Sequence, residues 1–267
     1  MAIERVLVVG GGDIGSAIAH SLFRRGIRVL VSERERSPHS RRGMAFTDAL
    51  FEGQASLDGV TARWQPDLAG VRECWQRLDA VPVVTLPEES LISSLAFDAI
   101  VEATMRRYQA PPDLRSLAPC TIGVGPGYMP GENCHVAIET QWGPAMGKVL
   151  RDRAPASRSG GPVALAGVTR ERFAIAPAAG IWRTGLSLGQ RVEAGEELGR
   201  LGQQQVRVPI SGYVRGLSRD GVQVPAGQRV AEVDPRDEPQ VFGLGERPRA
   251  IAEGVVLALG LHCAAVP

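Results

Sequence analysis

The chain has 267 residues, of which 44% are hydrophobic and 22% are charged, and its formal net charge is +1. This composition is typical of a globular protein, and the near-zero charge gives no electrostatic footprint for nucleic acid. We find no apolar run of about 18 residues and therefore expect no membrane span. Because the chain begins directly with a strand-like segment, we expect no signal peptide and a cytoplasmic location.

The cysteines do not suggest a metal or redox motif. None of the four forms a C-x-x-C pair, so a zinc ribbon or a thioredoxin-like site is not expected, and we predict no metal site. In a reducing cytosol free thiols are expected instead of disulfides. The four residues are Cys74, Cys120, Cys134 and Cys263.

Residues 3–33 predict a strand, a glycine loop, a helix and a second strand. Val6–Val9 is a continuous apolar run, as in a strand buried on both faces. Apolar residues at helical spacing follow it, and residues 28–31 form the second strand. Three glycines in the connecting loop fit G-x-G-x-x-G, a pattern that lets a pyrophosphate approach the backbone at a helix N-terminus. They are Gly10, Gly12 and Gly15.

Charged residues near this loop are further binding candidates. Glu33 lies just past the end of the second strand, where a carboxylate can accept hydrogen bonds from a ribose. Asp13 stands inside the loop, where it could cap the helix or repel a phosphate. Arg41 and Arg42 lie in the basic segment that follows, and they could bind a phosphate in a bidentate manner or form a solvated loop.

The pattern up to residue 124 alternates strands with helices, which predicts an α/β domain. We expect a short amphipathic piece first and then a hairpin or edge strand. In chain order, the expected elements after residue 44 are the short piece 45–50, the hairpin 54–63, a helix at 67–78, a strand at 81–86, a helix at 88–95 and strands at 97–103 and 120–124.

A second glycine loop and a polar strand follow. Gly125 and Gly127 come directly after a strand, which is where open α/β sheets bind ligands. In the strand expected at 133–140, His135 and Glu139 would share one face. They are candidate catalytic residues, and satisfied structural groups are the alternative. Cys134 is a further candidate, as a sulfur relay or a metal contact, provided that its thiol is exposed and activated.

The sequence pattern changes in the second half of the chain, from alternating strands and helices to short β-like pieces. A stretch rich in Pro, Ser and Gly marks a boundary, and short β-like pieces with an approximate internal repeat follow it. This repeat resembles the barrel-sandwich hybrid of biotinyl and lipoyl carrier domains. The matching hairpin, Gly202–Gln205, has no lysine, and Lys148 is the only lysine of the chain. We therefore exclude covalent biotin or lipoate at this hairpin.

The predicted fold class is α/β: a Rossmann-like N-terminal domain, a C-terminal all-β barrel-sandwich hybrid module and a final helix that packs back. The final helix is expected at 248–261. The domain limits are 1–158, 159–240 and 241–267.

The order of motifs resembles one family over nearly the whole chain. G-G-G-D-I-G, R-R-G-M-A-F, G-P-G-Y with N-C-H-V-A-I-E-T, and V-D-P-R occur in sequence. Together they are similar to the uncharacterised selenium-dependent molybdenum hydroxylase system proteins (YqeB type). The matching residues include Asp234 and Arg236 besides the candidates above. The chain departs from the family at 104–107, where T-M-R-R replaces a lysine-rich segment.

This resemblance implies an accessory or maturation protein for a molybdenum hydroxylase of the xanthine dehydrogenase class. The glycine loop would then bind a nucleotide or a molybdopterin-type ligand, with NAD(P) or molybdopterin cytosine dinucleotide as candidate cofactors, and the hydroxylase would be a client. An NAD(P)-dependent oxidoreductase with His135 as general acid or base is one alternative. A non-catalytic binding or scaffold protein is another. Homo-oligomers are left open.

Overall fold

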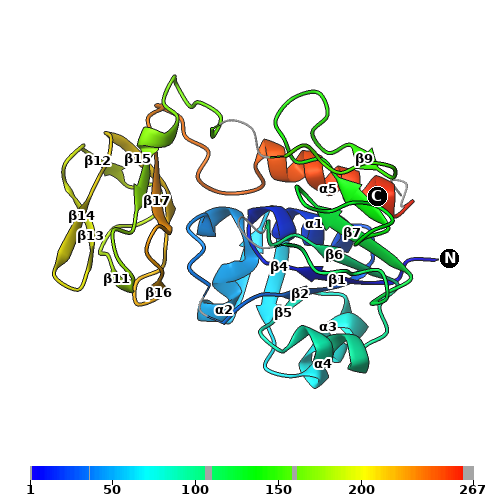
Figure 1. Ribbon diagram of the computed structural model, residues 1–267. Coiled ribbons are helices and arrows are strands. Elements are labelled where there is room, and N and C mark those ends of the chain that lie inside the picture. Colours follow the sequence, from blue (N-terminus) through cyan, green and yellow to red (C-terminus); the bar gives the residue numbers. More distant parts are fainter. Residues whose placement is uncertain (1, 36, 106–109, 158–160, 261–267) are drawn as a thin grey trace. The chain divides into compact units, whose positions relative to one another are not determined.

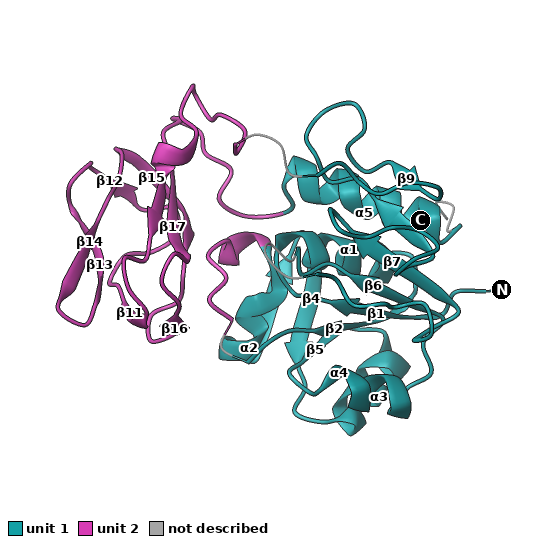
Figure 2. Cartoon of the chain, in the orientation of Figure 1, with its two compact units in different colours: residues 1–35, 45–159, 244–267 teal, residues 36–44, 160–243 magenta. Residues whose placement is uncertain are grey.

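The computed structural model describes residues 2–35, 37–105, 110–157 and 161–260. It divides into two compact units, which Figure 2 shows in different colours. The expected boundaries at 158 and 240 lie within a few residues of this division. One feature was not foreseen: residues 36–44 join the β-rich unit. The last helix, which was expected to pack back, belongs to the N-terminal unit. Unit 1 comprises residues 1–35, 45–159 and 244–267, and unit 2 comprises residues 36–44 and 160–243.

Unit 1 is built on one nine-stranded sheet. Its strands are β1 (Arg5–Val9), β2 (Arg28–Ser32), β3 (Gln54–Leu57), β4 (Val60–Trp64), β5 (Val81–Val84), β6 (Ala99–Glu102), β7 (Cys120–Val124), β8 (Val136–Ile138) and β9 (Val149–Leu150). They lie in the order β3-β4-β5-β2-β1-β6-β7-β8-β9. Within this order, all neighbouring strands from β4 across β1 to β8 pair parallel. Only the edge strands β3 and β9 pair antiparallel with their neighbours.

The parallel part of this sheet has a recognisable topology. The strands β5-β2-β1-β6-β7-β8 follow the order 3-2-1-4-5-6 of doubly wound dinucleotide-binding sheets. The expected hairpin 54–63 is present as β3 and β4, and β4 enters the sheet beside β5. The direction of strand succession reverses between β1 and β6. In such sheets ligands bind beyond the carboxyl ends of the strands at this point.

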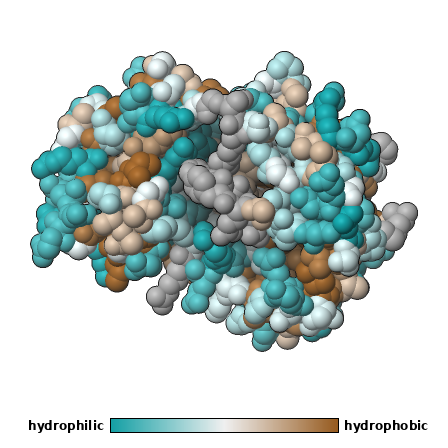
Figure 3. Space-filling model, in the orientation of Figure 1, coloured by the Kyte–Doolittle hydropathy of each residue, from teal (hydrophilic) through white to brown (hydrophobic). Residues whose placement is uncertain are grey.

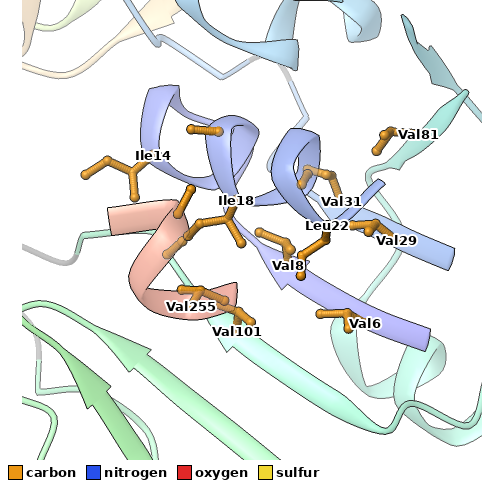
Figure 4. Close-up of a cluster of buried hydrophobic side chains, with 14 of the residues drawn as sticks. Val6, Val8, Ile14, Ile18, Leu22, Val29, Val31, Val81, Val101 and Val255 are labelled. Atoms are coloured by element: carbon orange, nitrogen blue, oxygen red, sulfur yellow. The ribbon is translucent and has the colours of Figure 1, made fainter. Parts of the chain in front are cut away.

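Helices cover both faces of the sheet, and α1 and α5 lie on the face opposite α3 and α4 (Figure 1). Successive side chains of β1 alternate between the two layers. Val6 and Val8 pack with α1 and α5 (Figure 4), whereas Leu7 and Val9 pack with α3 and α4. The helices are α1 (Asp13–Phe23), α2 (Ala49–Glu52), α3 (Leu68–Arg77), α4 (Glu88–Ser94) and α5 (Glu246–Ala258), with a 3-10 turn at Phe46–Asp48.

The last helix returns to unit 1 and packs on α1. Its Gly254 allows a close approach to the loop at Gly147, because a Cβ there would lie 2.1 Å from the carbonyl oxygen of Gly147. At Gly260 a Cβ would have nothing within 4 Å, and its φ of +69° suits the end of a helix. Close packing therefore requires the first glycine, and the second terminates the helix.

Unit 2 consists of two four-stranded antiparallel sheets. Its strands are β10 (Phe173–Ile175), β11 (Gly180–Arg183), β12 (Arg191–Val192), β13 (Glu197–Leu201), β14 (Gln204–Arg207), β15 (Gly212–Leu217), β16 (Gln223–Val224) and β17 (Arg229–Asp234), with 3-10 turns at Arg42–Met44 and Arg170–Arg172. The sheet orders are β10-β17-β15-β12 and β14-β13-β11-β16.

The two copies of the internal repeat exchange one strand each between these two sheets. In each copy the first and third strands share a sheet, as β11 with β13 and β15 with β17. The short middle strand pairs with the other copy, because β12 lies beside β15 and β16 lies beside β11. Neither copy therefore closes its sheet alone. Trp182 on β11 is fully buried and packs against Gly199 of the neighbouring strand β13, where a Cβ would clash with the indole.

The surface carries no large gathering of apolar residues in the view of Figure 3, where small apolar patches alternate with polar ones. Among the described residues, no helix combines the length and apolar character needed to span a membrane.

Candidate functional site

The glycine loop joins β1 to α1, and two of its glycines are required by sterics. Gly10 has a φ of +100°, and a Cβ there would lie 2.9 Å from the backbone nitrogen of Thr104. At Gly15 a Cβ would lie 1.8 Å from the carbonyl oxygen of Gly10. Gly12 is the N-cap residue of α1. The loop thus brings the helix N-terminus close to the ends of β1 and β6.

Glu33, just beyond β2, contacts this loop. Its Oε2 accepts the backbone N–H of Gly11 at 3.0 Å, and its Oε1 accepts that of Arg34 at 2.7 Å. The Glu33 side chain is only 10% exposed. The carboxylate predicted to bind a ribose is therefore held beside the glycine loop, where it also orders the backbone.

Asp13 is the first residue of α1, and its Oδ1 accepts the backbone N–H of Ile14 at 3.1 Å. A carboxylate in the first turn interacts favourably with the positive end of the helix dipole. It also places negative charge where a phosphate would bind. Asp13 thus satisfies one N–H of the first turn although Gly12 is the N-cap residue, and its expected effect on a phosphate stays a prediction.

Arg41 and Arg42 belong to unit 2 instead of the unit that carries the glycine loop. The guanidinium of Arg41 pairs with the buried carboxylate of Glu232, with Nε–Oε2 at 3.0 Å and Nη2–Oε2 at 2.8 Å. This ion pair gives Arg41 a structural role that sequence reasoning missed. The expected contact of both arginines with a phosphate stays a prediction.

The second glycine loop follows β7, and both expected glycines have positive φ, +93° at Gly125 and +96° at Gly127. The Asn133 side chain braces the loop, because its Nδ2 donates to the carbonyl oxygen of Gly127 at 3.0 Å. Tyr128 packs closely against Gly123, where a Cβ would clash with the ring. The loop is thus a rigid turn at the carboxyl edge of the sheet.

Tyr128 leads to a carboxylate that the sequence analysis did not single out. Its hydroxyl donates to Oε2 of Glu102 at 2.6 Å, and Oε1 of Glu102 accepts from the hydroxyl and backbone N–H of Thr104. Glu102 and Tyr128 are each 2% exposed. The sequence contains a signal for Glu102, because an acidic residue directly follows the apolar run Ala99–Val101. An acidic residue at the end of an apolar strand also identified Glu33.

Two carboxylates therefore flank the glycine loop. Val9, the last residue of β1, is in register with Ser32 on one side and with Glu102 on the other. Glu33 follows Ser32, so the acids lie on the two strands adjacent to β1. Glu33 is the partly exposed acceptor beside a helix N-terminus that attracts anions, whereas Glu102 is buried and both of its oxygens already accept hydrogen bonds. The arrangement suits a ligand that combines hydroxyl or amide donors with a phosphate.

His135 lies at the opposite edge of the sheet. It precedes β8, it is exposed, and its Nδ1 accepts the backbone N–H of Thr121 at 3.0 Å. Glu139 follows the same strand, about 13 Å away at 3.3 Å per extended residue. The structure therefore does not bring His135 and Glu139 together as a pair. The expectation that both residues share one face of a strand stays a prediction, but the strand β8 between them keeps their side chains apart.

Glu139 is buried and holds backbone in place. Its Oε1 accepts the N–H groups of Thr140 and Gln141, each at 2.8 Å, and its Oε2 accepts that of Ala156 at 2.7 Å. Three backbone N–H donors satisfy the acceptors of this buried carboxylate. This geometry supports the structural alternative that the sequence left open, and it gives Glu139 no catalytic contact.

Cys134 is fully buried in a small cluster that includes Leu114 and Tyr128. Burial raises the pKa of its thiol to about 11, although a hydrogen bond from the backbone of Gly123 and the charge of Arg115 act in the opposite direction. A sulfur relay needs an accessible thiolate. The structure provides neither the accessibility nor the thiolate, so it does not support this role.

The remaining family-matched residues lie mainly in unit 2. Asp234 is fully buried and accepts two hydrogen bonds from the guanidinium of Arg236, at 2.9 Å and 2.6 Å, and one from its backbone N–H at 3.1 Å. The departure at 104–107 falls partly outside the described residues, which include Thr104 and Met105 but not Arg106 and Arg107. Within the described part of the chain, no three His, Cys, Asp or Glu side chains are grouped to hold a metal ion.

Comparison with known proteins gives one informative relative. The chain is 35% identical over 257 residues to the uncharacterized protein YqeB of Escherichia coli (strain K12), a match covering 96% of the chain. The chain resembles YqeB. This similarity supports the relationship to the YqeB family that the motifs predicted. The match covers 47% of YqeB, so the chain spans about half the length of this curated relative. No family model matches the chain.

Solved structures add little. AtPrR2 in its apo form is 20% identical over 48% of the chain and 40% of its own length, with a TM-score of 0.27. The ectoine utilization protein EutE (DoeB) from Ruegeria pomeroyi, bound to its product, is 12% identical over 88% of the chain and 86% of its own length, with a TM-score of 0.28. Likenesses at this level carry no argument about fold or function.

Proposed function

We propose that unit 1 binds a nucleotide-type ligand at the carboxyl ends of β1, β2 and β6, and that the protein is an accessory or maturation factor for a molybdenum hydroxylase of the xanthine dehydrogenase class. One observation carries the ligand proposal. Glu33 is held at the glycine loop by the N–H of Gly11, at the point where the strand order reverses.

The groups at this edge fit the parts of a dinucleotide. The N-terminus of α1 attracts a phosphate or pyrophosphate through its free N–H groups and its dipole. The carboxylate of Glu33 accepts hydrogen bonds from ribose hydroxyls. NAD(P) and molybdopterin cytosine dinucleotide both contain a pyrophosphate and a ribose, so both are candidate ligands. A Rossmann-like assignment for unit 1 is part of this proposal, and the strand order supports it.

The link to molybdenum hydroxylases comes from the family resemblance and is supported by the similarity to YqeB. In this proposal unit 2 is a barrel-sandwich hybrid that docks the client hydroxylase. Its tight β13–β14 hairpin carries Gln203 and Gln204 where a carrier domain would have its lysine. The module would therefore act through its surface and not through a swinging cofactor.

The alternatives have less support. An NAD(P)-dependent oxidoreductase would need a proton-transfer group beside the bound cofactor, and His135 lies at the other edge of the sheet. A scaffold without a ligand would have no need for a carboxylate and a helix N-terminus at one edge. Neither alternative has an observation of its own in favour.

Thermal unfolding of the purified protein with a ligand panel tests the proposal. The panel contains NAD, NADP, CTP, molybdate and molybdopterin cytosine dinucleotide. A ligand that binds only the folded state stabilises it by about 2.7 kcal/mol at a hundredfold excess over Kd. A shift with the pterin dinucleotide alone supports the maturation function, and a shift with NAD or NADP alone favours the oxidoreductase. If no ligand shifts the transition, the nucleotide proposal fails.

A Gly12→Val variant separates loop binding from binding elsewhere. Gly12 has a φ of −66° as the N-cap of α1, which valine can adopt, so the fold should survive. The side chain would stand between a pyrophosphate and the loop backbone. We expect the variant to lose the ligand-induced shift while its circular dichroism stays unchanged. An undiminished shift would place the ligand elsewhere.

A further inference from the structure

Residues 36–44, here called the strap, leave the end of β2 and belong to unit 2 before the chain returns to unit 1. Backbone and side-chain bonds hold the strap on unit 2. The carbonyl oxygen of Ser40 accepts the N–H of Leu217 at 2.6 Å, and that of Pro38 accepts the hydroxyl of Ser218 at 2.9 Å. Gly43 accepts the N–H of Gly243 at 3.0 Å. The strap thus completes the packing of unit 2.

A buried ionic hub adds to this attachment. Glu232 on β17 is 2% exposed and accepts hydrogen bonds from three arginines. Arg41 comes from the strap, Arg172 from the 3-10 turn before β10, and Arg215 from β15. Removing one member of such a buried cluster leaves the other charges less compensated. The strap is therefore tied to unit 2 by charge as well as by hydrogen bonds.

Both flanks of the strap meet at one residue of the glycine loop, Gly11. Before the strap, Glu33 accepts the N–H of Gly11 with one oxygen and the N–H of Arg34 with the other, at 3.0 Å and 2.7 Å. After the strap, the N–H of Phe46 donates to the hydroxyl of Ser16 at 2.8 Å, and that hydroxyl donates to the carbonyl oxygen of Gly11 at 2.9 Å. The backbone of Gly11 is thus linked to both flanks of the strap, directly to Glu33 and through the Ser16 hydroxyl to Phe46.

We propose that the strap couples ligand binding at the glycine loop to the packing of unit 2. This inference rests on the proposed function, because it concerns the regulation of the same site. A ribose that bonds to Glu33 must share a carboxylate that already orders Gly11 and the start of the strap. Binding then loosens the strap, and unit 2 loses part of the attachment at Leu217 and Ser218. A client docked on unit 2 therefore contacts a differently packed unit 2 when a ligand occupies the glycine loop.

Thermodynamic linkage makes the coupling reciprocal. If ligand binding loosens the strap, a substitution that loosens the strap beforehand must strengthen ligand binding, by at most the factor by which it shifts the strap equilibrium. Loss of one neutral hydrogen bond changes such an equilibrium by roughly fivefold. The coupling can therefore be measured with substitutions in unit 2 that leave the glycine loop unchanged.

The first test measures hydrogen–deuterium exchange with NAD as the probe. We expect the peptides that contain the Leu217 and Gly243 amides to exchange faster with NAD bound, because these amides donate to strap carbonyls. A Ser218→Ala variant should bind NAD up to about fivefold more tightly, since it lacks the bond to Pro38. Ser211→Ala is the matched control, because the Ser211 hydroxyl bonds to Ala194 and not to the strap. Bound NAD with unchanged or slower exchange would overturn the coupling and leave the proposed function intact.

The second test needs no ligand and keeps the inference testable if NAD does not bind. Ser16→Ala removes the bridge between Phe46 and Gly11 and should speed exchange at the Leu217 amide in unit 2. Ser21→Ala, on the same helix and also buried, is the control and should leave it unchanged. Equal exchange in the two variants would overturn the coupling. Failure of every nucleotide to bind would count only against the proposed function.

Discussion

Arg41 and Glu232 are separated by 191 residues in the sequence, yet their side chains form a bidentate ion pair in the interior of unit 2. The Glu232 carboxylate is only 3% exposed, and Arg172 and Arg215 bond to the same group. Burial alone would raise the pKa of Glu232, but the positive charges of Arg41, Arg215 and Arg172 outweigh it and hold the pKa below its usual range. The carboxylate is therefore the anionic centre on which the strap and the β-sheet of unit 2 converge.

Neutralising this centre should destabilise the protein strongly. We expect Glu232→Gln to lower the free energy of unfolding by about 3 kcal/mol, because three guanidinium groups lose the charge that compensates their burial. The measurement is urea denaturation. Glu197→Gln is the control, since Glu197 also pairs with an arginine, Arg200, but at the surface, where the denaturation midpoint should hardly move.

The same carboxylate predicts a pH dependence. Because the folded-state pKa of Glu232 is lowered, its contribution to stability is present above the unfolded value of about 4.3 and is lost as the pH falls through the folded value. The difference in stability between the wild type and Glu232→Gln should therefore be constant near neutral pH and shrink below about pH 4. A difference that persists undiminished in acid would contradict the charge-based explanation.

Gly15 should not tolerate a methyl group. Its Cβ would lie 1.8 Å from the carbonyl oxygen of Gly10, which is backbone and cannot rotate away. We expect Gly15→Ala to destabilise the fold by about 3 kcal/mol, at the upper end of overpacking effects. Gly185→Ala is the control, because a Cβ there has nothing within 4 Å. Thermal unfolding of both variants measures the contrast.

The Cys134 thiol should be inert in the folded protein. Burial raises its pKa to about 11, so almost no thiolate forms near neutral pH. Treatment with iodoacetamide followed by mass spectrometry should find Cys134 unmodified under native conditions and modified in denaturant. Rapid native alkylation would restore the sulfur-relay hypothesis.

Two substitutions at opposite edges of the sheet should differ in ligand binding. Glu33→Gln keeps an acceptor but removes the charge, and we expect the Kd of a bound nucleotide to rise by roughly tenfold to a hundredfold. His135→Ala should leave the Kd unchanged, because His135 lies at the amino end of β8. Titration calorimetry with the ligand found in the thermal panel compares them. An effect of His135→Ala equal to that of Glu33→Gln would contradict the proposed location of the site.

Local patterns in the sequence were sufficient for most of unit 1. The continuous apolar run at Val6–Val9, the glycines after it and the acid at Glu33 predicted β1, the loop and the end of β2, because buried parallel strands and tight turns restrict residue type directly. The strand at Cys120–Val124 was predicted with its observed bounds. The predicted strand at 133–140 was too long, since only Val136–Ile138 pairs with neighbours.

The tertiary structure decided which charged residues meet. Arg41 and Arg42 follow the glycine loop closely in sequence, yet they fold into unit 2, because the partner that compensates Arg41 lies 191 residues away. Glu102 and Tyr128 come from different strand ends, and only the parallel pairing of β6 and β7 brings them within 2.6 Å. Sequence by itself determined where strands, helices and glycine turns form, since these depend on neighbouring residues. The assembly of the charged hub and of the Glu102–Tyr128 pair depends on long-range packing, which no local pattern encodes.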